Sequence, residues 1–465
     1  LVTAPELPAT TIYSQSYFRM FNGCTKLNYV KAMCTDISAS MCLAGWLNNV
    51  SPTGTFIKSK DATWTNEQAE IPTGWTVQVE KEYLCFTSTG DSMISMNQVG
   101  TPNTSANKVI QYKLNDGQWQ NWDMSNVTLA DGDKMYIKSD DEIPMSEADT
   151  IYKQFKMTGS IATTGNIMSL LSFSTTLTNY AFYKLFRECT SLTTAPELPA
   201  TTLAEGCYRH MFYGCTSLTT APELPTTTLA ERCYYMMFYG CSSLTQAPEL
   251  PATTLTNNCY YAMFYNCTSL TTAPELPATT LADHCYYAMF LGCTSLVTVH
   301  ALPATTLAAS CYFGMFQNCT ALTHAPELPA TTLAESCYRG MFQGCTALTT
   351  TPELPATTMA EWCYNGMFLG CTSLTQAPAL PATTLATSCY NSMFKRCTSL
   401  TTAPELPATT IAYDAYTSMF NGCTKLNYVK AMFTTIPTEG VYLTNWLNSV
   451  SATGTFVKNA AATYA

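Results

Sequence analysis

Hydrophobic and polar positions repeat with a fixed period of 26 residues along the second half of this chain. The cysteine of a Cys-Thr-Ser-Leu-type motif recurs without insertions at residues 189, 215, 241, 267, 293, 319, 345, 371, 397 and 423. A fixed period between about 20 and 50 residues is typical of repeat proteins, in which each unit buries its apolar face against its neighbours. The pattern therefore predicts a solenoid of stacked coils.

Two hydrophobic patterns follow each other within one unit. The first is a short extended segment with three apolar residues and two prolines: Leu192, Ala195, Leu198, Pro196 and Pro199. Proline keeps this segment out of a helix and limits its pairing. The second has apolar residues at i, i+3, i+4 and i+7, which predicts one face of a short helix: Tyr208, Met211, Phe212 and Cys215. We therefore expect parallel short strands on one face of the solenoid and short helices on the other.

The repeated phrase resembles a known family. Met211-Phe212-Tyr-Gly-Cys215-Thr-Ser-Leu218 and Ala181-Phe182 are similar to the BspA-like leucine-rich repeat, also called the Treponema pallidum type. The resemblance covers residues 1–43 and 174–432, although the 26-residue unit is longer than the usual one. It implies an α/β leucine-rich-repeat solenoid in an extracellular or surface-exposed protein that adheres to host proteins, other cells or matrix.

Residues 65–158 interrupt the period. Four runs in this block are typical of strands: 83–87, 92–96, 109–113 and 134–138. Asp116-Gly117 and Asp131-Gly132 are hairpin-turn signals. The block therefore predicts a small all-β sandwich that covers the first coil, because the ends of a solenoid must be shielded.

This organisation predicts four domains. They are the end of an upstream leucine-rich repeat block with its C-terminal cap (1–64), the β-sandwich (65–158), the 26-residue repeats (159–432) and a C-terminal cap (433–465). Residues 1–58 closely match 400–458, and Leu1 falls in the middle of a repeat. We therefore expect a piece of a longer modular polypeptide that contains further modules of the same kind.

Composition excludes several functions. Charged residues make up 12% of the chain, the net charge is −10, and no run of Lys or Arg occurs. Nucleic acid is therefore not an expected partner, because neutralising phosphates requires a basic stripe. No apolar run reaches the roughly 18 residues of a membrane span, so membrane insertion is not expected.

Most of the 22 cysteines fall into two repeated positions. We expect two ladders of buried, reduced thiols that act as small hydrophobic groups. No Cys-x-x-Cys pair or Cys/His cluster indicates zinc, and no cofactor or metal is expected. No nucleophile–base pair or phosphate loop appears either, so the sequence does not predict an enzyme.

Comparison of the repeats separates constant positions from variable ones. Variation gathers at the positions of Glu205, Arg209 and Tyr213, where successive coils place seven aromatic residues: Tyr213, Tyr235, Tyr239, Tyr261, Tyr265, Tyr287 and Phe313. Exposed aromatic residues of this kind suit glycan stacking or a protein hot spot. The alternative is drift on an unconstrained surface.

Two other features offer weaker candidates. A glutamate recurs in the extended segment: Glu197, Glu223, Glu249, Glu275, Glu327, Glu353 and Glu405. Stacked carboxylates repel and could take up cations, but the interruptions at Ala301 and Ala379 favour solvated surface glutamates. Trp119 and Trp122 could bind sugar or form a hairpin core.

These observations predict an extracellular, non-enzymatic binding or adhesion module that recognises a protein or glycan on a cell or matrix surface. Its location is then a cell surface or a virion surface. The alternative is a structural spacer, or a receptor-binding appendage component of a virion of the phage tail fibre type.

Overall fold

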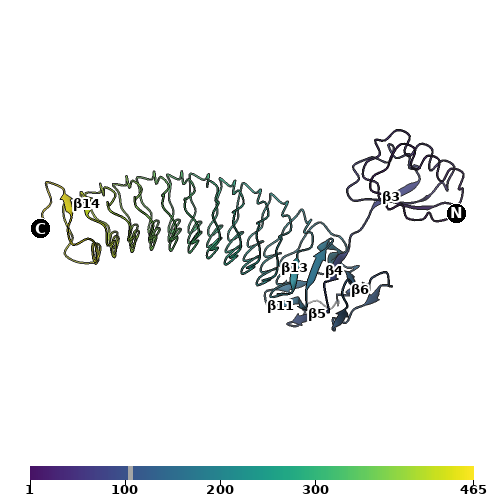
Figure 1. The fold of residues 1–465 in the computed structure, drawn as a ribbon, viewed down its shortest axis with the longest axis horizontal. Helices are drawn as coiled ribbons and strands as arrows, with labels where there is room; N and C mark the ends of the chain where they lie inside the picture. Colours follow the sequence, from purple (N-terminus) through teal and green to yellow (C-terminus); the bar gives the residue numbers. More distant parts are fainter. Residues whose placement is uncertain (103–107, 465) are drawn as a thin grey trace. The chain divides into compact units, whose positions relative to one another are not determined.

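The computed structural model divides the chain into two compact units, Leu1–Glu82 and Tyr83–Ala465, each considered by itself below (Figure 1). Residues 1–102 and 108–464 are described. Among them, no helix has the length and apolar character required to cross a bilayer.

The first unit contains a three-stranded parallel sheet. Its strands are β1 (Tyr29–Ala32), β2 (Gly54–Lys58) and β3 (Trp75–Val79), in that order. Three indole N–H groups donate hydrogen bonds that connect residues 64–79 to the preceding coils. The acceptors are backbone carbonyls: Trp46 donates to Ala69, Trp64 to Cys34, and Trp75 to Ser51. Residues 65–82 thus lie in the first unit, whereas the sequence placed a domain boundary at 64/65.

The second unit begins with two sheets. A four-stranded sheet has the order β10–β11–β5–β8, made of Ser146–Ala148, Ile151–Thr158, Ser92–Val99 and Val127–Leu129. A six-stranded sheet has the order β13–β12–β4–β9–β6–β7, made of Leu192–Thr194, Ile161–Thr164, Leu84–Ser88, Lys134–Lys138, Gln111–Leu114 and Gln120–Asn121. The four strands that the sequence predicted in this block correspond to β4, β5, β6 and β9.

These sheets contact each other and the first coil through aromatic rings. Phe86 of β4 lies 5.0 Å from Phe155 of β11, and Phe155 lies 5.0 Å from Phe186 of the first coil. Strand β12 continues into the coils by parallel pairing with β13. The Asp116-Gly117 turn joins β6 to β7 as expected, but Asp131-Gly132 joins β8 and β9, which belong to different sheets.

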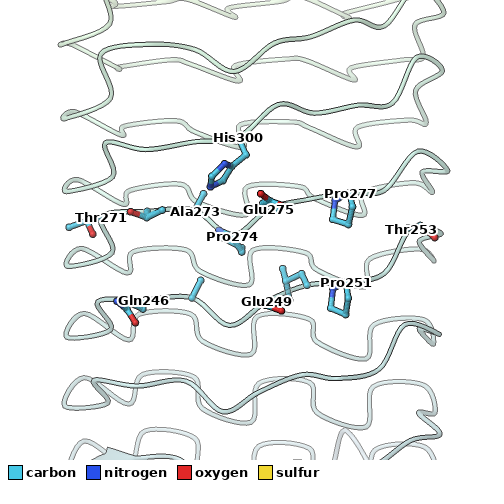
Figure 2. Close-up of a pocket in the computed structure, with 13 residues that line it drawn as sticks. Gln246, Glu249, Pro251, Thr253, Thr271, Ala273, Pro274, Glu275, Pro277 and His300 are labelled. Carbon is cyan, nitrogen blue, oxygen red and sulfur yellow. The ribbon is translucent and has the colours of Figure 1, made fainter.

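The coils are held together by isolated parallel bridges rather than by continuous strands. Bridges precede each Pro-Glu-Leu-Pro segment, as in Thr220↔Gln246 and Gln246↔Thr272, and others follow it, as in Thr254↔Thr280. Proline has no N–H to donate, so the ladder is interrupted between these points. Figure 2 shows two such neighbouring segments, with Glu249 and Pro251 in one coil and Glu275 and Pro277 in the next. The expected continuous parallel sheet is therefore reduced to single bridges in the inner coils.

The predicted short helices are wrong. The only helix among the described residues is the 3₁₀ turn η1 (Ile167–Leu171), and the segment equivalent to residues 205–214 is a run of turns in every coil. Successive backbone N–H groups of this segment donate alternately to a carbonyl of the same coil and to a carbonyl of the next coil. Cys207 and Arg209 donate to carbonyls three residues back, whereas Tyr208 and His210 donate to Cys233 and Tyr235 of the next coil.

A left-handed residue at every fourth position produces this alternation. In one coil these residues are Gly206, His210 and Gly214, with φ of 58°, 58° and 71°. Each left-handed residue interrupts the right-handed backbone, so no helix forms, and alternate N–H groups point toward the neighbouring coil. The apolar spacing seen in the sequence fits this four-residue period as well as it fits a helix, because Cys207 is buried together with Tyr208, Met211, Phe212 and Cys215.

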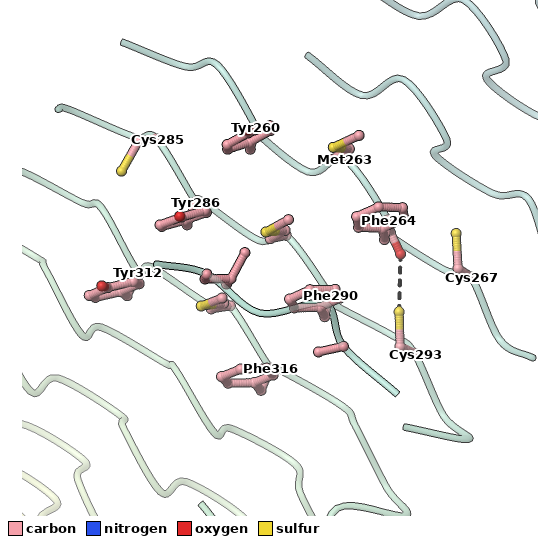
Figure 3. Packing of buried hydrophobic residues seen from close by; sticks show 14 of the residues in the cluster. Tyr260, Met263, Phe264, Cys267, Cys285, Tyr286, Phe290, Cys293, Tyr312 and Phe316 are labelled. Atoms are coloured by element: carbon pink, nitrogen blue, oxygen red, sulfur yellow. Dashed lines mark hydrogen bonds between the residues drawn. The ribbon is translucent and has the colours of Figure 1, made fainter. Parts of the chain in front are cut away.

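Buried ladders fill the interior (Figure 3). Phe264 and Phe290 stack with centroids 5.6 Å apart, and Tyr260 and Tyr286 with centroids 5.8 Å apart. The motif cysteines are free thiols that donate to a phenylalanine carbonyl, as Cys293 does to Phe264 at 3.0 Å. Every cysteine except the half-exposed Cys24 is buried, so the expected thiol ladders are present.

The second unit ends in two parallel strands, β14 (Tyr428–Ala431) and β15 (Thr455–Lys458). They match β1 and β2 of the first unit residue for residue in their pairing. Phe56 is fully buried beneath the Trp64–Trp75 segment, whereas its equivalent Phe456 is 42% exposed. In the first unit, the Trp64–Trp75 segment therefore covers the last strand of the coils.

Candidate functional site

The four-residue period of the turn segment places the variable residues on one face. Two buried residues alternate with two partly exposed ones, so Arg209 and Tyr213 point outward between buried pairs. The next coil repeats this arrangement 26 residues later with Tyr235 and Tyr239. Because each coil bonds to the next through this segment, equivalent outward side chains stand directly in line.

The structure brings all seven predicted aromatic residues together in two columns. We call Tyr235, Tyr261, Tyr287 and Phe313 the middle column, and Tyr213, Tyr239 and Tyr265 the flanking column. Neighbouring rings in both columns are stacked, with centroids 4.5–4.6 Å apart and interplanar angles of 3–10°. All seven side chains are half-buried.

Guanidinium groups lie at the ends of the columns. Arg209 lies over the first ring of the middle column, Tyr235, at 5.0 Å, and Arg339 over the last, Phe313, at 5.4 Å. Arg187 covers Tyr213, the first ring of the flanking column, at 5.0 Å. A cation over an aromatic face is attracted by the negative potential of the ring, so these arginines stabilise the column ends.

This geometry changes what the columns can bind. Stacking covers both faces of each internal ring, so a sugar ring cannot stack on Tyr239, Tyr261 or Tyr287. Ring edges and phenol hydroxyls remain for a ligand. Burial, followed by the neighbouring phenols, raises the pKa of Tyr261 and of Tyr239, so both hydroxyls keep their protons at neutral pH and can donate.

One group that the sequence analysis did not single out lies beside the columns. His210 packs against Tyr183, Tyr213 and Tyr235, with centroid distances of 5.5–5.8 Å. Burial, with Arg209, Lys184 and Arg187 nearby, lowers its pKa to about 3. These basic residues are separated along the sequence, and only the stacking of two coils brings them together.

The opposite face carries the glutamates. A cavity of about 710 Å³ lies between two successive Pro-Glu-Leu-Pro segments, with Glu249, Glu275 and His300 in its lining (Figure 2). Smaller cavities of about 460 and 270 Å³ occupy the same place beside Glu223 and Glu353. At both repeat-block ends the equivalent glutamate pairs with lysine at 2.8 Å, as Glu6 does with Lys31 and Glu405 with Lys430.

Neither Trp119 nor Trp122 has an exposed ring face of the kind on which a sugar stacks. Trp122 is buried in the core of the β-sheets and lies 6.3 Å from Phe155. Trp119 is half-buried between Tyr83, at 4.9 Å, and the ammonium groups of Lys113 and Lys138. Within the described part of the chain, no group of three or more His, Cys, Asp or Glu side chains is arranged to hold a metal ion.

Comparison with known families agrees with this architecture. The BspA type leucine-rich repeat region matches residues 165–296, 263–377, 289–427 and 335–458, which together span more than half of the chain. The chain belongs to the BspA-type leucine-rich repeat family. No curated protein and no solved structure matches it significantly. The matched residues include every aromatic residue of the two columns, so the candidate site lies within the BspA-type repeats.

Proposed function

We propose that this protein is a non-enzymatic, extracellular binding module that recognises a protein or glycan on a cell or matrix surface. The observation that carries the proposal is the pair of aromatic columns on the variable face of the coils. BspA-type repeats are often found in surface proteins that take part in adhesion, which supports the same role.

The distribution of variation supports a binding face. The Pro-Glu-Leu-Pro side is nearly constant from coil to coil, whereas the turn face carries Tyr, Phe, Arg or Asn at one and the same position. Aromatic residues are clustered in adjacent coils instead of being scattered along the array. Half-buried tyrosines are typical anchors of protein and glycan interfaces, since they bury a large area at little entropic cost.

The state of the titratable groups supports a non-enzymatic role. Burial raises the pKa of the thiol of Cys293 to about 12, so this ladder member offers no thiolate nucleophile at neutral pH. The low pKa of His210 likewise leaves its imidazole neutral and buried. Glu223 and Glu353 lie beside cavities in the same place of their coils, so their surroundings do not separate an acid from a base.

The architecture we propose for this role is a continuous leucine-rich-repeat solenoid. In this arrangement the two β-sheets of residues 84–164 form a sandwich that closes the first coil, and β14 and β15 close the last. Its location would be a cell surface or, if the parent particle is a phage, the virion surface. Further modules of the same polypeptide would continue the array.

A structural spacer is the second candidate function. The specific observation in its favour is the uniformity of the coils, because the covered ring faces of the columns also strengthen contacts between neighbouring coils. A spacer of the phage tail fibre type would need this stiffness and no ligand.

Saturable binding of the full chain to intact bacterial cells and to host matrix proteins, measured side by side, tests the proposal. The first variant is Tyr235→Asn/Tyr261→Asn/Tyr287→Asn, since Asn365 and Asn391 occupy the same position in later coils. The matched control on the opposite face is Glu249→Ala/Glu275→Ala, since Ala301 and Ala379 occupy that position. We expect the asparagine variant to lose binding while the alanine control retains it.

A second variant separates binding from folding. Tyr235→Phe/Tyr261→Phe/Tyr287→Phe keeps the stack, as Phe313 does, and removes only the hydroxyls. Circular dichroism and a melting curve for each variant establish that the coils remain intact. No saturable binding of the folded wild-type chain to cells or to matrix would refute the adhesion role and leave the spacer.

A further inference from the structure

Three basic side chains and a histidine converge where the aromatic columns begin. We call Lys184, Arg187, Arg209 and His210 the basic corner. All three cations lie near enough to His210 to lower its pKa, after the larger effect of burial. In a chain with a net charge of −10, these residues bring three cations together on the proposed binding face.

Aromatic rings, not carboxylates, hold two of these cations. Lys184 Nζ lies 4.7 Å from the ring centroids of both Tyr152 and Tyr183. Arg209 lies over Tyr183 at 5.6 Å and over Tyr235 at 5.0 Å. In residues 1–102 and 108–464, neither cation has a carboxylate partner within ion-pair distance.

Carboxylates also lie near this corner. Glu188 pairs with Arg187 at 2.9 Å, and Glu205 and Glu231 each pair with Arg232 at 3.3 Å. Asp149 lies near enough to Tyr183 to raise the pKa of its hydroxyl. Among the described residues, Lys184 and Arg209 are therefore the two cations of the corner that no direct ion pair neutralises.

Two buried polar atoms in the corner also lack partners. Arg209 Nε and His210 Nδ1 are shielded from solvent and have no hydrogen-bond partner. A buried N–H group without an acceptor is unfavourable, and an anion satisfies such a donor better than a neutral acceptor does. An oxyanion beside the guanidinium of Arg209 would offset the clustered charge, and a small movement of this side chain would bring its shielded Nε–H to the same acceptor.

We propose that the basic corner binds the carboxylate or sulfate of an acidic polysaccharide, whose hydroxyls then follow the edges of the tyrosine columns. This inference rests on the proposed binding function and names its ligand class. Each column presents one phenol hydroxyl per coil in three successive coils, which gives two short rows of hydrogen-bonding groups suited to a linear polymer of sugars. They do not suit a single-stranded nucleic acid, because its bases would need open ring faces on which to stack.

The test compares defined polymers on the full chain by calorimetry. Dextran sulfate supplies sulfate alone, hyaluronan supplies carboxylate alone, dextran is the neutral control, and polyglutamate is an acidic peptide. We expect saturable binding of dextran sulfate or hyaluronan, at least tenfold weaker binding of polyglutamate, and no binding of dextran. Comparing dextran sulfate with hyaluronan identifies which acidic group the corner accepts.

Two double variants that each remove two positive charges test whether the acidic polysaccharide binds at the basic corner. Lys184→Ser/Arg209→Asn introduces residues that this chain carries at equivalent positions, namely Ser392 and Asn365. Lys395→Gln/Arg396→Asn removes the same charge far along the coils and also uses native alternatives, Gln343 and Asn318. We expect at least a tenfold loss of affinity for the acidic polysaccharide in the first variant and less than a twofold loss in the second. Both variants should keep the circular dichroism spectrum and the cooperative melting of the wild type, with a slightly lower melting temperature for the first because Arg209 no longer covers Tyr235.

Several outcomes would overturn the inference. Equal losses in both variants would indicate general charge attraction, and equal binding of polyglutamate would indicate no preference for sugars. If the wild-type chain binds cells through the columns but binds neither acidic polysaccharide, this inference fails while the proposed function stands. If it binds neither cells nor matrix nor these polymers, both fail.

Discussion

At the scale of single residues, the left-handed positions of the turn segment hold glycine in some coils and other residues, at a conformational cost, in the rest. Gly340 and Gly366 have φ of 61°, and the equivalent positions of two earlier coils hold Ala262 and Ala288 at 47° and 50°. Alanine in this conformation is strained by about 1–2 kcal/mol because its Cβ approaches the following carbonyl. These coils therefore carry a local cost that the stacking on either side must offset.

We predict that Gly340→Ala destabilises the second unit by about 1 kcal/mol. An added Cβ would meet nothing closer than Gln343 Oε1 at 3.5 Å, so the cost is conformational and not steric. Urea unfolding gives the change, with the exposed Thr346→Ala as the control, expected within about 0.5 kcal/mol of wild type. Equal stabilities of the glycine and alanine forms would contradict the left-handed assignment.

The buried thiols predict a loss of stability at alkaline pH. Burial raises the pKa of Cys293 from 9.0 to about 12, and the pKa values of Cys337 and Cys345 also to about 12. Between pH 9 and 12 the folded thiol keeps a proton that the unfolded thiol loses. Stability must therefore fall as pH rises through this window, by about 1.4 kcal/mol per pH unit for each such thiol, and is fully present below pH 9.

Urea unfolding at pH 8 and pH 10 measures this slope. The first unit is an internal control, because it holds only Cys24, Cys34 and Cys42, of which Cys24 is half-exposed. We expect the transition of the second unit to move much further toward low urea than that of the first. The same shift for both units would rule out the thiol ladders as its cause.

At the scale of elements, the period and the interior of the coils could be predicted from the sequence, but the form of the turn segment could not. Tyr208, Met211, Phe212 and Cys215 satisfy a helical spacing, and the burial of these residues is as predicted. The helix is absent because every fourth residue is left-handed. Glycines at 206 and 214 were a signal for this, yet His210 between them concealed the pattern.

The candidate site, too, could be predicted only in part from the sequence. The seven aromatic residues could be selected from internal variation, and the structure places them in columns. Stacking of their faces could not be foreseen, because it depends on the distance between coils. The basic corner was hidden as well, since Lys184 and Arg209 lie 25 residues apart and meet only when adjacent coils stack.

Stacking within the middle column has a measurable energetic consequence. Tyr261 lies 4.5 Å from both Tyr235 and Tyr287, so Tyr261→Ala removes two aromatic pairs. We predict a destabilisation of about 2 kcal/mol, since such pairs contribute about 0.5–1.5 kcal/mol each beyond the buried area. Chemical denaturation of Tyr261→Phe, which retains both stacks, should stay within about 0.5 kcal/mol of wild type. A similar loss in both variants would assign the effect to the hydroxyl instead.

At the scale of the whole molecule, the last strands of a repeat block occur twice, once in each compact unit. Residues 29–58 and 428–458 have the same paired strands, and in the first unit the chain continues into the Trp64–Trp75 segment and β3. That segment buries Phe56 completely, whereas Phe456 remains 42% exposed. The comparison isolates what residues 65–82 contribute, because the strands beneath them are alike.

We predict that a fragment of residues 1–82 folds by itself and that a fragment of residues 1–64 does not fold stably. The shorter fragment loses Ala69, Ile71 and Trp75 from the core and leaves one edge of β2 unpaired. Because removing a buried tryptophan alone costs about 3–5 kcal/mol, this loss is comparable with the whole stability of a domain this small.

Thermal unfolding followed by circular dichroism separates the two outcomes. A cooperative transition for 1–82 and none for 1–64 would place the unit boundary after Glu82, in agreement with the contacts. Equal stability of the two fragments would instead favour a boundary at residue 64 and make residues 65–82 a linker. The variant Trp75→Ala in the longer fragment tests one contact of this segment. The Trp75 indole donates to Ser51, so if this contact holds β3 in place, the variant should melt at a lower temperature than the unmodified 1–82 fragment but still show a cooperative transition.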